Sequence, residues 1–105
     1  MNRYGSKKEK GSNDFPWVIL YHPQVVQHDI PRLSKTERER VKNTIEKKIA
    51  IEPALYGIPL RGVYEQYWKL RVGNWRVVYS LKKTTVYILV IAHRKEIYRI
   101  GKRRL

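Results

Sequence analysis

The clearest pattern of apolar and polar positions lies between Tyr67 and Tyr79, where apolar side chains fill alternate positions on both sides of Gly73-Asn74. Such alternation is typical of β-strands, and a Gly-Asn pair suits a two-residue hairpin loop because both residues tolerate positive φ. With the turn centred there, directly opposed residues share a face of the sheet. One face then forms a core surface of Trp68, Leu70, Val72, Trp75, Val77 and Tyr79. The other face carries Tyr67, Lys69, Arg71 and Arg76.

Two helices are predicted before the hairpin. A first strand is expected at Phe15–Tyr21. Residues 24–29 suit a short helix, because the proline at position 23 favours a first helical turn. The valines of this helix should pack inward, and its polar face should expose Asp29. A second helix begins at the capping-box sequence Ser34-Lys35-Thr36-Glu37 and continues to about residue 51, with apolar residues spaced by four. Both helices are expected to cover the apolar face of the hairpin.

The second half of the chain predicts a loop and a further strand. Residues 53–65 contain two prolines and two glycines, so we expect a loop there. Val86–Ala92 is continuously apolar, which predicts a strand with neighbours on both sides. The order β-α-α-β-β-β predicts an α+β fold with an antiparallel-rich sheet and two helices packed on one face. We expect a single domain at residues 15–100, between basic tails at residues 1–14 and 101–105.

The charge of the chain is its most unusual bulk property. The net charge is +14 over 105 residues, and such an excess points to a polyanionic partner: nucleic acid first, then an acidic protein, then an anionic membrane surface. The absence of cysteine excludes disulfides, cysteine zinc sites and cysteine nucleophiles. No segment has the apolar run of a signal peptide or a membrane span, so we expect a soluble, cytoplasmic protein without a membrane partner.

The opposition of Arg71 and Arg76 is the first indication of a binding site. Like charges directly opposed across two strands destabilise the pair. This face is therefore either a solvated surface where the side chains splay apart or a site for an anion such as phosphate. Pairing of the last two strands brings the segment after the apolar strand close to Arg76, so we expect convergence of Lys69, Arg71, Arg76, Arg94 and Tyr98. Arg61 either extends this surface or is an ordinary exposed loop arginine.

Three motifs, in this order, resemble the RelE/ParE toxin superfamily of bacterial and archaeal toxin–antitoxin systems. They are Pro-Leu-Arg-Gly at residues 59–62, Lys-Leu-Arg-Val-Gly-Asn-Trp-Arg-Val-Val-Tyr at residues 69–79, and His-Arg-Lys-Glu-Ile-Tyr at residues 93–98. The resemblance covers roughly residues 18–98 and is closer to the RelE branch. That branch implies a toxin that is a ribosome-dependent endoribonuclease, which cuts messenger RNA in the A site and so inhibits translation. The ParE branch instead poisons DNA gyrase.

The RelE branch uses the 2′-hydroxyl of the RNA to attack the adjacent phosphate, so the resemblance implies neither a metal nor a cofactor. It implies that Arg76 and Arg94 stabilise the charge of the transition state and that Tyr98 and Lys69 transfer protons. Cationic neighbours are expected to lower the pKa of Tyr98, although this residue could equally stack on a base. The expected substrate-binding residues are Arg71, Arg61, His93 and Lys95.

The partners that the resemblance implies are messenger RNA in the ribosomal A site, the 30S and 70S ribosome with its rRNA, and a cognate acidic antitoxin that neutralises the basic surface. Two other functions stay open at this point. The first is a ParE-like toxin that inhibits gyrase without cutting RNA. The second is a non-catalytic relative that binds nucleic acid or an antitoxin.

Overall fold

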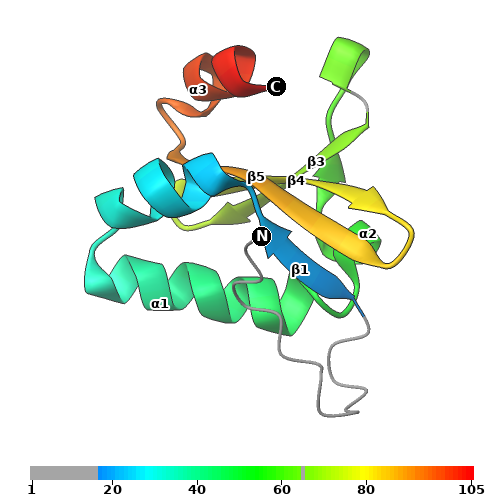
Figure 1. The fold of residues 1–105 in the computed structure, drawn as a ribbon, viewed down its shortest axis with the longest axis horizontal. Helices are drawn as coiled ribbons and strands as arrows, with labels where there is room; N and C mark the ends of the chain where they lie inside the picture. Colours follow the sequence, from blue (N-terminus) through cyan, green and yellow to red (C-terminus); the bar gives the residue numbers. More distant parts are fainter. Residues whose placement is uncertain (1–16, 65) are drawn as a thin grey trace.

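A single mixed β-sheet forms the centre of the molecule. The computed structural model describes residues 17–64 and 66–105, and its strands lie in the order β1-β5-β4-β3-β2 (Figure 1). β1 pairs parallel with β5, and the other neighbours pair antiparallel. The strands are β1 (Val18–Tyr21), β2 (Ile58–Pro59), β3 (Tyr67–Val72), β4 (Trp75–Lys82) and β5 (Thr85–His93). The expected N-terminal tail, residues 1–14, lies outside the described residues, as do the first two residues of the expected first strand.

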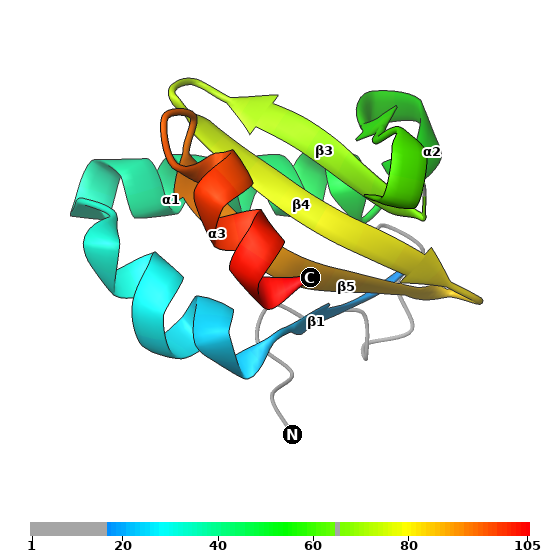
Figure 2. The same ribbon diagram turned by 90° about the horizontal axis from the view of Figure 1, so that it is seen from above.

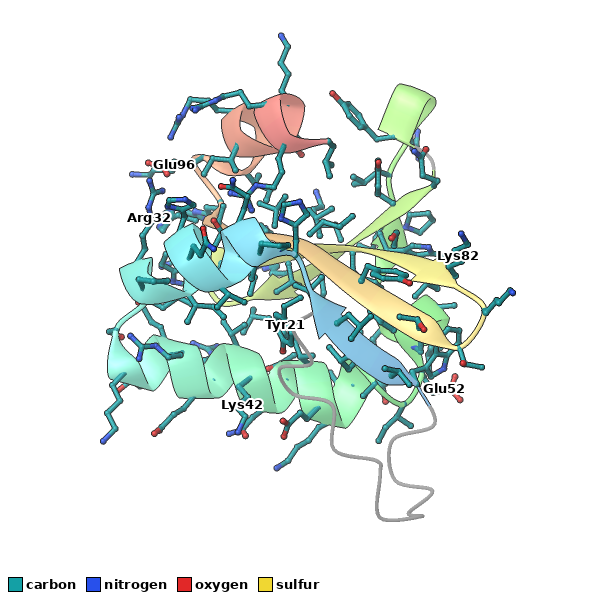
Figure 3. The ribbon with its side chains drawn as sticks, viewed as in Figure 1. Tyr21, Arg32, Lys42, Glu52, Lys82 and Glu96 are labelled. Carbon is teal, nitrogen blue, oxygen red and sulfur yellow. The ribbon has the colours of Figure 1, made fainter. Side chains whose placement is uncertain are left out.

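The second predicted helix covers one face of this sheet, whereas the first lies beside the edge of β5 beyond the end of β1 and packs into the same core (Figures 1 and 2). The first consists of two short segments, Val25–Asp29 and Ile30–Arg32. The second is α1 (Lys35–Thr44), which continues through a wider helical turn at Ile45–Ile49. The capping box is confirmed, because Ser34 Oγ accepts the Glu37 N–H and the Glu37 carboxylate accepts the Ser34 N–H. Figure 3 shows Tyr21 between the sheet and α1, whereas Lys42 projects from the outer side of the helix.

The layer between these helices and the sheet is the main core. It contains the stripe predicted for α1, together with the apolar face of the hairpin, and Val25, Val77, Tyr79, Val86 and Ile88 are fully buried. Burying one such aliphatic side chain contributes about 1.5–3 kcal/mol relative to exposure. No helix in the described ranges is long and apolar enough to cross a membrane.

The hairpin has the register that the Gly-Asn turn predicts. Val72 pairs with Trp75, and Arg71 pairs with Arg76. Gly73 has a φ of +61°, which lies in the left-handed region that glycine adopts without steric cost. The two faces predicted for the hairpin are therefore confirmed.

A third helix, α3 (Ile97–Arg104), lies on the opposite face of the sheet (Figure 2). It closes a second, smaller apolar cluster that contains Val78, Val90, Ala92, Ile97 and Ile100. The expected C-terminal tail from residue 101 is therefore not observed, because residues 101–104 form the last turn of α3 and Gly101 is buried. The sheet is covered on both faces, which explains the continuously apolar sequence of β5.

A β-bulge interrupts the pairing of β4 and β5. Val78 pairs with Val90, but its neighbour Tyr79 pairs with Ile88, so Leu89 is an extra residue on β5. Because of this extra residue, Leu89 and Val90 both belong to the α3 side, and Ile91 returns to the main core. The alternation of faces beyond the bulge is therefore the reverse of the alternation before it.

Residues 53–65, expected to be a loop, also contain short elements. These are α2 (Pro53–Tyr56), the edge strand β2 and a single helical turn at residues 62–64. The buried hydroxyl of Tyr79 donates a hydrogen bond of 2.7 Å to the Pro53 carbonyl, and burial raises the pKa of Tyr79, so this hydroxyl stays protonated. Gly57 is required beside it, because a Cβ at this position would overlap the Tyr79 hydroxyl.

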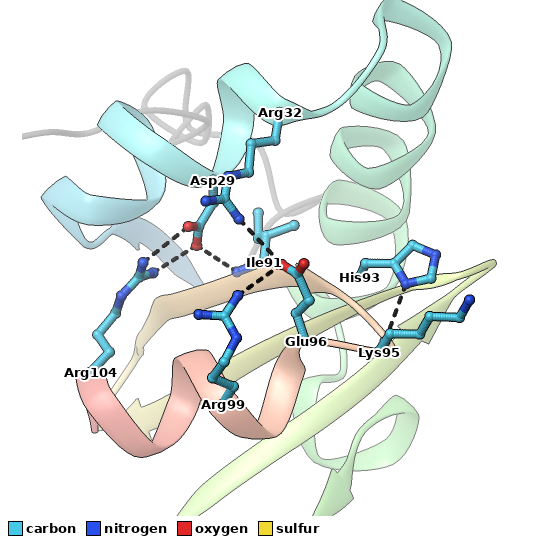
Figure 4. Close-up of polar contacts among 8 residues, drawn as sticks. All are labelled: Asp29, Arg32, Ile91, His93, Lys95, Glu96, Arg99 and Arg104. Atoms are coloured by element: carbon cyan, nitrogen blue, oxygen red, sulfur yellow. Dashed lines mark hydrogen bonds and ion pairs between the residues drawn. The ribbon is translucent and has the colours of Figure 1, made fainter.

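Asp29 is not on a solvent-exposed face, in contrast to the sequence prediction. It is 2% exposed and is the only buried charged side chain in the part of the chain that the structure describes. β1 ends opposite Ile88, and beyond that point the Asp29 carboxylate accepts the Ile91 N–H of β5 at 2.8 Å. Arg104 donates to both Asp29 oxygens, at 2.7 and 3.0 Å (Figure 4). It also donates to the Leu89 carbonyl. Asp29 thus satisfies the open edge of β5 and fixes the end of α3 to it.

Candidate functional site

Basic side chains from three elements gather on the sheet face that α3 partly covers. Lys69 and Arg71 come from β3, and Arg76 comes from β4 directly opposite Arg71. Arg94 follows β5 in the turn that leads to α3, and Tyr98 is the second residue of α3. We call this group of five residues the cationic face.

Arg76 has the most constrained side chain of the cationic face. Its Nη1 donates to the backbone carbonyls of Gly73 (2.9 Å) and Trp75 (3.0 Å), so the guanidinium is held against the hairpin turn. Partial burial lowers the pKa of Arg76, and the charges of Arg71 and Arg94 lower it further, while Tyr98 acts in the opposite direction. The side chain stays charged, because an arginine pKa begins above about 12. Its Nε and Nη2 have no partner within residues 17–64 and 66–105 and are available to an anion.

Arg94 is placed beside Arg76 by its own backbone. The Arg94 N–H donates to the Asn74 carbonyl at 2.8 Å, which joins the turn after β5 to the hairpin turn between β3 and β4. Arg71 and Arg94 are both exposed. The charges of both residues lower the pKa of Arg76, as expected for guanidinium groups that lie near it.

Tyr98 and Lys69 form a direct contact across the gap between α3 and the sheet. Lys69 Nζ donates to Tyr98 Oη at 3.4 Å and lies 5.6 Å from the centre of the tyrosine ring. Tyr98 is 73% exposed despite this contact. A tyrosine that is not needed for packing, and that lies next to an ammonium group, has its hydroxyl and its ring face open to a ligand.

A groove of about 370 Å³ opens beside Tyr98, between α3 and the edge strand β2. Its lining is mostly apolar and includes Ile58, Leu60, Val78, Ile97 and Leu105. Arg61, Lys69, Tyr98 and Lys102 add polar groups to this groove. Arg61 therefore extends the surface around Tyr98, which is one of the two alternatives that the sequence left open for it.

His93 is not brought to the cationic face. It pairs with Trp75 across β4 and β5, and the two rings meet edge to face with their centres 5.6 Å apart. Trp75 packs against the main core on the other side of the sheet, and the bulge at Leu89 places His93 on that side. His93 Nδ1 also accepts the Lys95 N–H at 3.2 Å (Figure 4). The Lys95 side chain is exposed in the turn, and within the described residues it makes no contact with the cationic face.

Sequence reasoning missed two residues that line the site, Lys102 and Leu105. Both were assigned to a C-terminal tail. The signal for a helix was present, because Ile97, Ile100, Gly101 and Leu105 lie at helical spacing along the chain. In the structure Leu105 packs partly into the second cluster, and Lys102 lies one turn beyond Tyr98 on the same side of α3.

Comparison with solved structures identifies the fold as that of RelE-like toxins. The chain superposes on the toxin–antitoxin complex RelBE2 from Mycobacterium tuberculosis with a TM-score of 0.70 and 26% identity, over 75% of this chain and 99% of that chain. It superposes on the RelB–RelE antitoxin–toxin complex from Methanococcus jannaschii with a TM-score of 0.61 and 24% identity, over 77% of this chain and 96% of that chain.

Residues 19–98 match the family described as ParE toxin of type II toxin–antitoxin system, parDE. The chain therefore belongs to the RelE/ParE family of type II toxins. A search of curated protein sequences gave no match. The resemblance noted in the sequence is confirmed at the level of the family and of the fold.

Proposed function

We propose that this toxin is an endoribonuclease that cuts messenger RNA in the ribosomal A site and so stops translation. The observation that carries the proposal is the contact between Lys69 and Tyr98, 3.4 Å long and open to solvent, beside an Arg76 side chain that is already oriented by two backbone carbonyls. A phosphate site and a proton-transfer group are the two requirements for RNA cleavage by the 2′-hydroxyl, and the proposal assigns them to Arg76 and to the Lys69–Tyr98 pair.

In the proposed reaction the 2′-oxygen of one nucleotide attacks the adjacent phosphorus, and the bond from phosphorus to the 5′-oxygen breaks. The free Nε–H and Nη2–H groups of Arg76, with Arg94, stabilise the added charge on the phosphate oxygens. One proton leaves the 2′-hydroxyl and one is given to the leaving 5′-oxygen; Tyr98 Oη makes one of these two transfers, and Lys69 Nζ, which contacts Tyr98 Oη, makes the other. Arg71 and Arg61 bind flanking phosphates. The nucleophile comes from the substrate, so this chemistry requires neither a metal nor a cofactor.

The direct test adds purified protein to translating ribosomes and maps the new transcript ends by primer extension. Wild-type protein should cut within codons, and Arg76→Ala should cut about 10²–10³-fold more slowly, because one preorganised donor to the transition state is lost. Lys47→Ala, which removes an exposed lysine from the outer side of the helical layer, is the matched control and should cut at the wild-type rate. Equal rates for Arg76→Ala and wild type would reject the role of Arg76, and a wild-type protein that cuts nothing would reject the nuclease.

A second candidate function is inhibition of DNA gyrase, and the family match itself favours it, because the matching family is described by its ParE toxin. A gyrase inhibitor needs no proton-transfer group. Inhibition of supercoiling that is unchanged in Tyr98→Phe, with no cleavage of transcripts, would select this function. Inhibition of translation with intact supercoiling would exclude it.

An acidic antitoxin is the partner that both functions share. The two solved structures compared above are complexes of a toxin with its antitoxin. The apolar groove between α3 and β2, with basic residues around it, suits an amphipathic acidic segment, because apolar side chains bury area and carboxylates pair with the rim. The proposed place of action of the toxin and its antitoxin is the cytoplasm, where ribosomes are found.

A further inference from the structure

A second and larger cleft lies on the other flank of α3. It has a volume of about 550 Å³ and opens between α3 and the helical segment Val25–Asp29. Unlike the groove beside Tyr98, its lining is polar, and Ile100 is the apolar side chain within it. The basic residues in its lining are Arg32, Arg99, Arg103, Arg104, His22 and His28.

The spacing of residues along α3 separates the two sites. Tyr98 and Lys102 are four residues apart and line the apolar groove, whereas Arg99 and Arg103 are four residues apart and line the polar cleft. Residues at this spacing lie on the same side of a helix. The helix therefore presents one flank to the proposed cleavage site and the other flank to the polar cleft.

The charges of the cleft are not balanced. Four arginines face two carboxylates, Asp29 and Glu96. The buried Asp29 is fully used by Arg104. Arg32 and Arg99 both lie 3.3 Å from the same Glu96 oxygen, and all three side chains are about half exposed (Figure 4).

The bonds to Glu96 are easily exchanged, because an exposed ion pair contributes at most about 1 kcal/mol. Arg103 has no partner in residues 17–64 and 66–105. His22 Nδ1 accepts the Gln24 N–H, which leaves Nε2–H as a further donor in the cleft. Three arginine side chains are therefore available to a ligand that brings more negative charge than Glu96 supplies.

We propose that this cleft binds the phosphodiester backbone of RNA, as a docking site separate from the cleavage site. Arginine forks bind phosphate oxygens in pairs, and nucleic-acid interfaces are polar and cationic. A protein partner would need apolar and aromatic side chains at its centre, which the groove beside Tyr98 offers and this cleft does not. The proposal rests on the proposed function only in taking RNA as the partner, since it requires binding and not cleavage.

The test measures binding to a short 2′-O-methylated RNA, which lacks the nucleophile and cannot be cut. Affinity is measured by fluorescence anisotropy over a range of salt concentrations for wild type and for the double variant Arg99→Ala/Arg103→Ala. The plot of log K against log salt has a negative slope, and each lost phosphate contact should reduce its magnitude by about 0.7. The slope of the double variant should therefore be smaller in magnitude by about 1.4 than that of wild type. The double variant Lys35→Ala/Lys47→Ala removes the same charge from exposed sites in the helical layer of the opposite face, and should keep the wild-type slope.

Two further measurements separate this inference from the alternatives. The variant Arg99→Lys/Arg103→Lys keeps both positive charges and should have most of the wild-type slope. Recovery of the slope would show that the Ala double variant loses it through the missing charges and not through unfolding of α3. If the Ala double variant keeps the wild-type slope, the cleft does not bind RNA and the inference is wrong. If it keeps that slope but loses affinity for polyglutamate, the cleft binds an acidic protein instead. A wild type that binds the modified RNA but cuts no transcript would reject the nuclease and leave the docking site standing.

Discussion

Arg71 and Arg76 lie directly opposite each other on β3 and β4, with both side chains on the face that carries Tyr98. Neither forms an ion pair with an acidic residue in the described ranges, and the two positive charges repel each other. Arg76 is in addition held in place by the carbonyls of the hairpin turn, so it does not move away from Arg71 freely. The repulsion is a cost to the free protein, and a bound phosphate relieves it.

This cost predicts that Arg71→Gln stabilises the free protein. Like charges directly opposed across two strands cost about 0.2–1 kcal/mol, so the melting temperature should rise slightly while RNA binding weakens. Lys82→Gln is the control. Lys82 is likewise an exposed basic residue of a strand, β4, but it lies opposite the uncharged Thr85. Thermal denaturation at low salt gives the comparison. A melting temperature that falls in Arg71→Gln and not in Lys82→Gln would show that no repulsion is relieved.

Tyr98→Phe should separate chemistry from folding. The tyrosine is 73% exposed, so loss of its hydroxyl should leave the melting temperature unchanged, whereas loss of proton transfer should slow cleavage by about 10²–10⁴-fold. Tyr56→Phe is a close control, because Lys48 Nζ lies 5.5 Å from the Tyr56 ring in the same way that Lys69 lies near Tyr98. Primer extension on translating ribosomes measures both rates. Cleavage by Tyr98→Phe at the wild-type rate would exclude proton transfer by the Tyr98 hydroxyl and leave stacking on a base as the role of the ring.

Asp29→Ala should be the most destabilising of these substitutions. It leaves Arg104 without its carboxylate and the Ile91 N–H without an acceptor. Removing one partner of a buried ion pair costs about 3–5 kcal/mol. Glu96→Ala removes an exposed carboxylate with two arginine partners and should cost less than about 1 kcal/mol. Urea denaturation of both variants tests the contrast, and equal losses would show that the burial of Asp29 is unimportant.

Glu37 should make the stability of α1 depend on pH in the acid range. The N–H of Ser34 lowers the pKa of Glu37 most strongly. The nearby indole of Trp75, whose N–H has no hydrogen-bond partner of good geometry among the described residues, lowers it further. A carboxylate with a lowered pKa stabilises the fold above its ordinary pKa, near 4.3, and that stabilisation is lost as the pH falls through the lowered value. Wild type should therefore melt above Glu37→Gln at neutral pH, and the difference should vanish in acid. A constant difference would exclude this linkage.

The sequence predicted the parts of the structure that depend on short-range rules. Gly73-Asn74 determines the turn and hence the opposition of Arg71 and Arg76, and the capping box places the start of α1 at Lys35. Three residues of the cationic face, Lys69, Arg71 and Arg76, follow from that register. The pairing of β4 with β5, which the sequence also predicted, places Arg94 beside Arg76.

The parts that were missed depend on tertiary context. The single extra residue at Leu89 turns His93 away from the cationic face, and an apolar run with no polar alternation gives no sign of a bulge. Asp29 was expected at the surface because its partner, Arg104, is 75 residues away in the chain. The same partner explains why the basic C-terminal residues form a helix rather than a tail, since Arg104 is joined to Asp29 and to β5.

The most direct test of the account uses a messenger RNA in which one nucleotide of the A-site codon lacks its 2′-hydroxyl. Programmed ribosomes are mixed with wild-type protein, and the transcript is analysed for breaks at that codon. The account predicts a cut in the all-ribose message and none after the 2′-deoxy nucleotide, because the nucleophile is missing while every contact to the cationic face is kept. A cut at the same bond in the 2′-deoxy message would contradict it.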